Sequence, residues 1–198
     1  MSRLGQITLV TGGARSGKSQ FAESFFSEHE QICYIATSGA SQDDETRQRI
    51  LLHQNQRPST WQTHEAYLDL AEFLTGNSAA AYLLDCATML TTNYCYYLLK
   101  QRFGEDYQEI DRQLQHFSQQ EKADLETEIL AEWQKIVAAA RNLSSDLVIV
   151  TNEVGLGIVP EDAFTRWFRD VFGRVNQFLG KEADEAFLVI AGIPMKLK

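Results

Sequence analysis

The sequence predicts an α/β fold, a mostly parallel sheet with helices on both faces. Short apolar runs of strand length recur along the chain, at residues 7–11, 32–36, 80–84, 147–150 and 187–191. Such runs are typical of strands that are buried on both faces of a sheet. The segments between them are long enough for crossover helices, the connection that parallel strands need. We therefore expect one parallel sheet whose ligand-binding residues follow the carboxyl ends of its strands.

Composition favours one domain that binds small molecules. The chain has 198 residues, of which 44% are hydrophobic and 23% are charged, so we expect residues 1–198 to form a single globular domain. The net charge is −9 and the pI is about 4.9. A nucleic-acid partner is therefore not expected, because such binding requires a basic surface.

The chain shows no signal for export or for a membrane span. Its N-terminus lacks a basic segment followed by an apolar one, and no apolar run reaches the length of about 18 residues that a spanning helix needs. Cys33, Cys86 and Cys95 are odd in number and lack the spacing of metal ligands. Thiols of this kind fit a reducing compartment, so we expect a cytoplasmic protein.

The stretch GGARSGKS has the pattern of a phosphate-binding loop, the P-loop. Its glycines let the chain curl so that backbone N–H groups point at one anion, and the helix that begins near Gly17 adds its positive end. Lys18 can reach the outer phosphates of a nucleotide, and Ser19 offers a hydroxyl group to Mg²⁺. The nucleotide-binding residues expected here are Gly12, Gly13, Ala14, Arg15, Ser16, Gly17, Lys18 and Ser19.

The setting of this loop supports the assignment. An apolar run precedes it, and residues 19–28 have the spacing of one helical face, so the order is strand, loop, helix. The alternative is a glycine-rich turn that binds no ligand. We predict a P-loop NTPase fold of the RecA-like type, with Mg²⁺ as the cofactor.

Polar residues follow two other predicted strands. Asp85 ends the third apolar run and resembles a Walker-B carboxylate, which holds Mg²⁺ or its water shell. A strand-ending aspartate is also a common helix cap. Thr37, Ser38 and Gly39 follow the second run and either line the nucleotide or cap a helix.

Two later segments leave their roles open. Asn152 and Glu153 follow the fourth apolar run and either touch substrate or form caps and turns. Two glycines in the next residues permit unusual backbone angles and Pro160 can start a helix, so this loop either wraps a ligand or meets a neighbouring subunit. Lys196 and Lys198 either meet anions or belong to a solvated tail.

Residues 101–141 are expected to form a helical excursion from the domain, broken near Ser118. The apolar positions with mostly helical spacing are Ile110, Leu114, Phe117, Leu125, Ile129, Trp133, Ile136 and Val137. The aromatic-rich segment 94–99 precedes the excursion on a helix after the third strand. It lies either in the core or at a subunit interface.

A further helix is expected between Ser41 and His53. Ser41 and Asp44 form a capping box, and Pro58 disfavours helical geometry at the residue before it. His53 then lies in the last turn, four residues after Arg49 on the same face. A lone histidine on a helix is usually structural, so this spacing alone assigns it no function.

Six segments together resemble one enzyme family. They are TGGARSGKSQFAE, YIATS, DDETRQRILLHQNQRPSTWQTHE, TNEVGLGIVPE, FRDVFGRVNQ and AGIPMKLK. The family is the bifunctional adenosylcobinamide kinase / adenosylcobinamide-phosphate guanylyltransferase of cobalamin biosynthesis. The resemblance implies that ATP or GTP phosphorylates the aminopropanol hydroxyl of adenosylcobinamide. GMP from GTP is then joined to that phosphate.

The resemblance also implies roles for individual residues. His53 falls where the family carries its GMP–histidine intermediate. Beside the P-loop, the positions where the family contacts GTP are Thr37, Ser38, Gly39, Gln54, Asn55, Gln56, Arg57, Glu65 and Asp85. The family likeness further implies a homotrimer. Residues 101–125 and the segment CATML after the third strand depart from the family pattern, so no corrinoid contacts are assigned.

The implied chemistry is physically coherent. A neutral imidazole can attack the α-phosphorus of GTP and expel pyrophosphate, and Arg49 or Arg57 would offset charge on the phosphorus oxygens. In the kinase step the substrate hydroxyl attacks the γ-phosphorus, while Lys18 and Mg²⁺ stabilise the leaving charge. No general base for that hydroxyl stands out. One P-loop must present the γ-phosphate in one reaction and the α-phosphate in the other. Either the nucleotide is repositioned between the reactions, or the protein has two nucleotide sites.

Two other classes of P-loop protein account for less of the sequence. A plain small-molecule kinase explains the P-loop and Asp85 but gives no role to the helix around His53. A GTP-dependent switch needs a guanine-reading Asn-Lys-x-Asp element, which the chain lacks.

Overall fold

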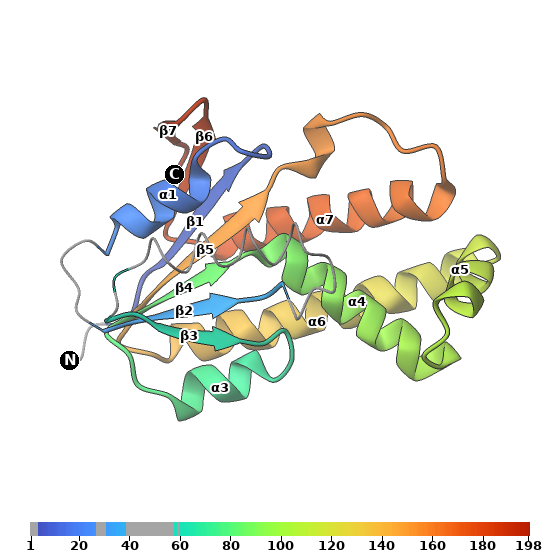
Figure 1. Cartoon of the computed structure of the whole chain (residues 1–198), viewed down its shortest axis with the longest axis horizontal. Helices are drawn as coiled ribbons and strands as arrows, with labels where there is room; N and C mark the ends of the chain where they lie inside the picture. Colours follow the sequence, from blue (N-terminus) through green and yellow to red (C-terminus); the bar gives the residue numbers. More distant parts are fainter. Residues whose placement is uncertain (1–3, 27–30, 39–57, 59) are drawn as a thin grey trace.

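A seven-stranded sheet forms the centre of the computed structural model, which describes residues 4–26, 31–38, 58 and 60–198 (Figure 1). The strands are β1 (Ile7–Gly12), β2 (Ile32–Ala36), β3 (Gln62–Glu65), β4 (Ala81–Asp85), β5 (Asp146–Asn152), β6 (Glu185–Ile190) and β7 (Ile193–Lys196). Their order is β3-β2-β4-β5-β1-β6-β7. Every neighbouring pair is parallel except β6 and β7, which are antiparallel. The sheet is thus mostly parallel, as predicted.

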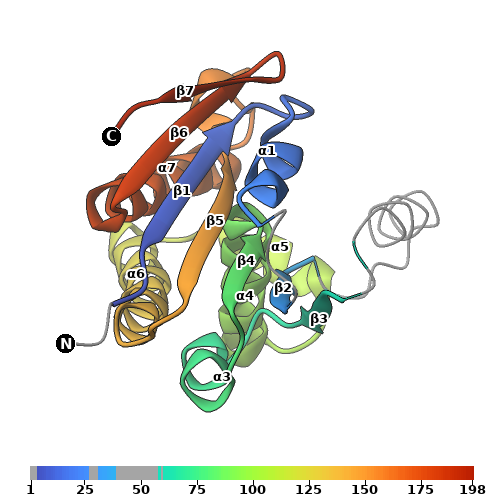
Figure 2. The same ribbon diagram turned by 90° about the vertical axis from the view of Figure 1, so that its left-hand side faces the viewer.

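Helices cover both faces of this sheet (Figure 2). They are α1 (Lys18–Ser24), α3 (Leu70–Gly76), α4 (Ala87–Phe103), α5 (Tyr107–Gln115), α6 (Gln119–Arg141) and α7 (Ala163–Glu182), with a 3-10 turn, η1 (Val154–Leu156). α1 packs on one face through the buried Ala22. α3, α6 and α7 bury the opposite face in a larger apolar core. The predicted α/β class is confirmed.

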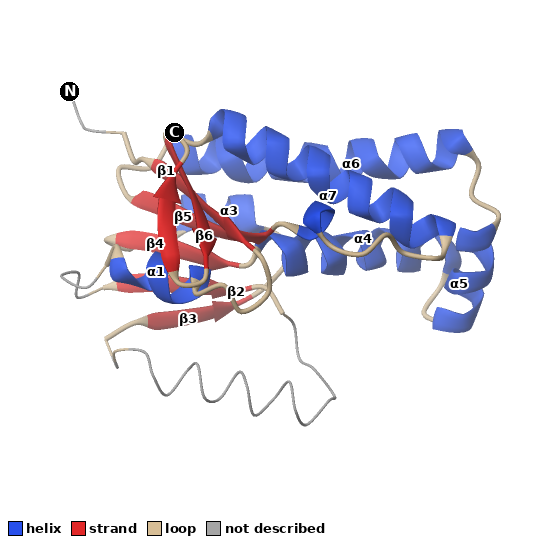
Figure 3. Cartoon of the chain, turned by 90° about the horizontal axis from the view of Figure 1, so that it is seen from above, coloured by secondary structure: helices blue, strands red, loops and turns tan. Residues whose placement is uncertain are grey.

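Three long helices, α4, α6 and α7, extend past the carboxyl end of the sheet, and α5 lies at their far end (Figure 3). The predicted break near Ser118 is confirmed, since Ser118 is the N-cap of α6. All eight apolar positions predicted within the helical excursion are buried. In α4, Cys95 and Leu99 are buried, and Tyr94 and Tyr96 pack against the same core.

Two strands were missed by the sequence analysis, and one helix begins later than expected. β3 and β7 are the edge strands of the sheet, and neither coincides with a predicted apolar run. α7 begins at Ala163 and not at Pro160. Its N-cap is Asp162, whose side chain accepts a hydrogen bond from the Thr165 N–H. The two glycines of the preceding loop, at 155 and 157, do not adopt left-handed angles.

The two lysines near the last residues are exposed, but both of their ammonium groups contact the domain. Lys196 lies in β7, and its Nζ is 2.6 Å from the Glu185 carboxylate. Lys198 Nζ donates to the backbone carbonyls of Gly180, Lys181 and Ala183 at the end of α7. Both ammonium groups therefore anchor this segment to the domain.

The expected helix at 41–53 lies outside the described residues, as do positions 27 and 28 of the first predicted helix. Cys33, Cys86 and Cys95 are buried free thiols. Among the residues described, no helix is long and apolar enough to cross a membrane.

Candidate active site

The P-loop joins the end of β1 to α1, and two of its glycines are required by close contacts. A Cβ on Gly12 would lie 2.5 Å from the Val189 carbonyl oxygen of β6. Gly17 has φ +94°, a left-handed conformation, and a Cβ there would lie 3.2 Å from the Cα of Gly192. A side chain at Gly12 would force the loop away from β6, and one at Gly17 would be strained by the left-handed backbone.

Lys18 and the hydroxyl groups of this segment are held inside the loop. Lys18 is only 9% exposed, and its Nζ donates to the Gly13 carbonyl at 3.0 Å. Ser19 follows it in the first turn of α1 and is half-buried. Within the described residues, the buried hydroxyls of Thr11 and Ser16 have no hydrogen-bond partner. The loop thus presents an ammonium and polar hydrogens at one place, as an anion site requires.

The turn of the β6–β7 hairpin braces the P-loop from the side. Ala191 and Gly192 have φ angles of 51° and 79°, the two left-handed residues of a tight hairpin turn. The Gly192 N–H donates to the Ser16 carbonyl at 2.8 Å. Sequence reasoning did not assign this contact, because it joins segments that lie far apart along the chain.

Asp85 lies at the end of β4 and is half-buried. Its Oδ2 accepts a bond from the Tyr34 hydroxyl at 2.9 Å. The N-cap of α4 is Cys86, and no side-chain hydrogen bond caps that helix. Asp85 is therefore not a helix cap, which was the alternative to a Walker-B role. Burial, aided by the charge of Asp85, raises the pKa of the Cys86 thiol, so this thiol stays neutral beside the carboxylate.

Thr37 ties the end of β2 to the end of β4. Its hydroxyl donates to the Cys86 carbonyl and accepts from the Cys86 N–H, both at 2.8 Å. Asn93 of α4 donates to the Thr37 carbonyl at 2.7 Å. Thr37 is fully buried, and its hydroxyl positions the turn after Asp85. A nucleotide contact of Thr37 and Ser38 stays a prediction.

The remaining predicted residues fall in two groups. Glu65 is exposed at the carboxyl end of β3, beside Ala36 of β2. The neighbouring His64 ring stacks on Phe73 with a centroid distance of 3.6 Å, which is a packing role. His53 lies outside the described residues, as do Gly39, Gln54, Asn55, Gln56 and Arg57.

The donor set fits a magnesium ion. Ser19 and Asp85 offer a hydroxyl and a carboxylate, and Mg²⁺ prefers such hard oxygen ligands together with water and substrate phosphates. No group of three or more His, Cys, Asp or Glu side chains gathers for a metal in the part of the chain that is described. A site completed by the nucleotide does not need such a group.

Comparisons with known proteins agree with this geometry. Residues 8–197 match the family described as cobinamide kinase / cobinamide phosphate guanyltransferase. Two curated relatives are named bifunctional adenosylcobalamin biosynthesis protein CobU. The protein of Salmonella typhimurium is 43% identical and that of Escherichia coli 42% identical, each over 194 residues that cover 97% of this chain and 99% of the relative.

Among solved structures, the chain is similar to the P4 protein from bacteriophage phi6 in complex with ADP. It aligns with 98% of this chain and 54% of its own, with a TM-score of 0.39 and 14% identity.

The family match covers nearly the whole chain, including the P-loop and the strand that ends in Asp85. It confirms the family that the sequence motifs predicted, together with the kinase and guanylyltransferase activities of that family. The chain belongs to the cobinamide kinase / cobinamide phosphate guanyltransferase family.

Proposed function

We propose that the chain performs both reactions of its family at the carboxyl edge of the sheet, on a nucleotide held by the P-loop. The observation that carries this proposal is the arrangement of three adjacent strands. The P-loop follows β1, Asp85 ends β4, and β5 lies between them. A triphosphate in the loop would then extend across the end of β5 toward Asp85.

In the kinase reaction, the P-loop holds the triphosphate through its N–H groups and through Lys18, which balances charge on the outer phosphates. Ser19 and Asp85 are the residues that would hold Mg²⁺, directly or through water. The bound ion would supply positive charge to the phosphate oxygens. The acceptor is the aminopropanol hydroxyl of adenosylcobinamide, and the γ-phosphoryl group of ATP or GTP moves to it.

In the guanylyl transfer, His53 is the proposed nucleophile. A neutral imidazole nitrogen attacks the α-phosphorus of GTP, and pyrophosphate leaves. An oxygen of adenosylcobinamide phosphate then attacks the same phosphorus and releases the histidine, which gives adenosylcobinamide-GDP. Arg49 and Arg57 are the proposed partners for charge on the phosphorus oxygens, and Gly39, Gln54, Asn55, Gln56 and Glu65 are proposed nucleotide contacts.

Labelled GTP tests this division of roles. With no acceptor present, the protein should retain label from α-labelled GTP and none from γ-labelled GTP. The bond should break in acid and survive in base, because protonation makes the nitrogen a better leaving group. His53→Ala should abolish this label and GMP transfer while phosphorylation of adenosylcobinamide continues.

Two further variants make the test decisive. His116→Ala changes an exposed histidine at the end of α5 and should retain full labelling. Lys18→Ala should lower both activities by about a hundredfold, the scale of losing one preorganised charge in a site. Undiminished acid-labile labelling of His53→Ala would move the nucleophile to another residue. Loss of only one activity in Lys18→Ala would show that the two reactions use separate sites.

We also propose that the single domain assembles as a homotrimer and works in the cytoplasm. Leu156, Ile158 and Val159 of the loop after β5 are exposed, as are Ile193 and Met195 of β7. Exposed apolar side chains in such numbers suit a contact between copies. Sedimentation at micromolar concentration should give a species three times the chain mass of 22.5 kDa. A stable monomer would contradict this proposal.

A further inference from the structure

Glu153 directly follows β5, between the two parts of the proposed kinase site. In the parallel registers, Gly12 of β1 pairs with Asn152, and Asp85 of β4 pairs with Val150. Glu153 is the next residue after Asn152, and its N–H donates to the Gly12 carbonyl at 3.1 Å. Its backbone is therefore attached to the first residue of the P-loop, and the strand that carries it lies beside the strand of Asp85 (Figure 1).

The backbone that carries Glu153 is fixed by bonds on both sides of the strand. The Thr88 hydroxyl of α4 accepts from the N–H and from the side-chain amide of Asn152, at 2.9 and 3.2 Å. On the other side, Asn176 of α7 donates to the Asn152 carbonyl at 3.1 Å and accepts from the Thr151 hydroxyl at 2.8 Å. Position 153 is thus held rigidly, as a residue that acts on a reacting atom must be.

The side chains of Asn152 and Glu153 differ in whether they have a hydrogen-bond partner. The Asn152 amide is engaged by Thr88, whereas the Glu153 carboxylate is half-buried and has neither a hydrogen-bond nor an ion-pair partner in the described part of the protein. Asp85, the other carboxylate at the ends of these strands, is held by Tyr34. A carboxylate on a fixed backbone that is bonded to the P-loop, without a partner among the described residues, points to a role toward the ligand.

We infer that Glu153 is the general base of the phosphoryl transfer, an inference that rests on the proposed kinase site. A Glu153 oxygen takes the proton of the acceptor hydroxyl as the hydroxyl oxygen forms its bond to the γ-phosphorus. The bond from the γ-phosphorus to the β,γ-bridging oxygen breaks, and the nucleoside diphosphate leaves with that electron pair. The carboxylic acid then returns its proton to water.

This role separates the two reactions of the enzyme. An alcohol keeps its proton at neutral pH and gains from a base during attack. The acceptor in guanylyl transfer is a phosphate oxygen, which already carries negative charge and needs no proton removed. Glu153 is therefore required for the first reaction and not for the second.

Glu153→Gln tests the inference, because the amide keeps the size of the side chain and cannot take the proton. The kcat of adenosylcobinamide phosphorylation should fall by about 10²- to 10⁴-fold, the usual contribution of a general base, while the KM for ATP stays within about threefold. Labelling by α-labelled GTP, and GMP transfer to adenosylcobinamide phosphate supplied ready-made, should stay at the wild-type rate.

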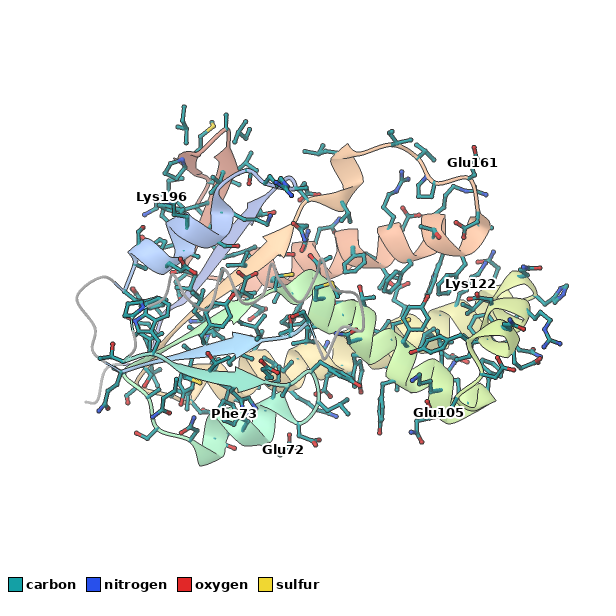
Figure 4. The ribbon with its side chains drawn as sticks, in the orientation of Figure 1. Glu72, Phe73, Glu105, Lys122, Glu161 and Lys196 are labelled. Atoms are coloured by element: carbon teal, nitrogen blue, oxygen red, sulfur yellow. The ribbon has the colours of Figure 1, made fainter. Side chains whose placement is uncertain are left out.

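Glu161→Gln is the matched control. Glu161 is an exposed glutamate in the connection that leads into α7 (Figure 4), and its replacement should leave both activities unchanged. Glu153→Ala allows a second measurement, chemical rescue. Added formate should restore part of the kinase rate of this variant if the lost group is a base.

Three results would overturn the inference. One is kinase activity of Glu153→Gln within twofold of wild type, another is an equal loss of both activities, and the third is no formate rescue in Glu153→Ala. The proposed site itself fails separately, if Lys18→Ala phosphorylates adenosylcobinamide normally.

Discussion

Tyr34 and Asp85 form the best-defined polar pair of the site. The Tyr34 hydroxyl donates to Asp85 Oδ2 at 2.9 Å, and Tyr34 is only 4% exposed. One carboxylate oxygen thus has a fixed donor, and the described residues place no hydrogen bond on the other. In the proposed function Tyr34 is a positioning residue, which orients Asp85 for the metal ion and does not touch the substrate.

Tyr34→Phe should raise the Mg²⁺ concentration that gives half-maximal kinase activity. The loss of one hydrogen bond to a carboxylate is worth about 1.5–3 kcal/mol, which corresponds to an upper limit of roughly 10- to 150-fold in an equilibrium constant. Titration of kinase activity with Mg²⁺ measures this shift. Tyr82→Phe is the control, because its hydroxyl donates to the Asn77 carbonyl ahead of β4. A similar lowering of stability in both variants with no change in the Mg²⁺ dependence would contradict the role of Tyr34.

At this scale the sequence predicted the residues that belong to a local motif. Gly17 and Lys18 follow from the loop pattern, and Asp85 follows from its place after an apolar run. Tyr34 and Gly192 could not be predicted, because each acts through a contact between segments distant in the sequence. Their own neighbours in the chain carry no signal of that contact.

At the scale of single elements, α6 depends on a reciprocal cap. The Ser118 hydroxyl accepts from the Glu121 N–H at 3.2 Å, and the Ser118 N–H donates to the Glu121 carboxylate at 2.8 Å. The first N–H groups of a helix have no carbonyl acceptor within the helix. These two bonds therefore satisfy N–H groups at the start of the 23-residue α6. The Ser118 hydroxyl also donates to the Glu121 carboxylate at 2.7 Å, and this bond, followed by that from the Ser118 N–H, lowers the pKa of the Glu121 carboxyl.

Ser118→Ala should destabilise the protein by about 1 kcal/mol, the usual effect of losing an N-cap. For a chain of this size such a loss lowers Tm by roughly 2–4 °C. Thermal melting followed by circular dichroism measures it. Thr127→Ala is the matched control on the exposed face of α6, where the Thr127 hydroxyl donates to the Ala123 carbonyl of the same helix. Equal changes in the two variants would show that the cap contributes nothing.

The elements that the sequence missed share a physical cause. β3 reads Gln-Thr-His-Glu and is mostly exposed, so it lacks the apolar run that marks a buried strand. β7 contains Pro194 and is exposed throughout, and a proline is tolerated only in an edge strand. By contrast, the break at Ser118 was predictable, since serine and glutamate three residues apart form a local capping signal.

At the scale of the whole molecule, Asp184 joins three distant parts of the chain. Its Oδ2 accepts from the Ile7 N–H of β1 at 2.8 Å and from Arg141 Nη1, at the end of α6, at 2.5 Å. Asp184 itself precedes β6. The bond from Arg141, followed by that from Ile7, lowers the pKa of Asp184 from its ordinary value of 3.8.

Asp184→Asn should therefore change how stability depends on pH. A carboxyl whose pKa is lower in the folded state stabilises the protein above its unfolded-state pKa, and this contribution is lost as the pH falls through the folded-state pKa. The difference in Tm between wild type and Asp184→Asn should be constant from pH 7 to about 5 and should shrink below about pH 4. Asp170→Asn, an exposed control on α7, should show no such trend. A difference that stays constant below pH 4 would contradict this account.

The contact between the β6–β7 turn and the P-loop links the edge of the sheet to the nucleotide. The Gly192 N–H binds the Ser16 carbonyl, so ordering of the loop by a phosphate group also restrains the outermost strand. Such coupling is reciprocal. Saturating ADP should therefore slow hydrogen exchange in β7 at least about fivefold, the lower end of typical coupling between sites, while α5 at the far end keeps its rate. By the same linkage, a neighbouring chain that covered β7 would raise the affinity of the P-loop for nucleotide. The affinity for nucleotide would then increase with protein concentration.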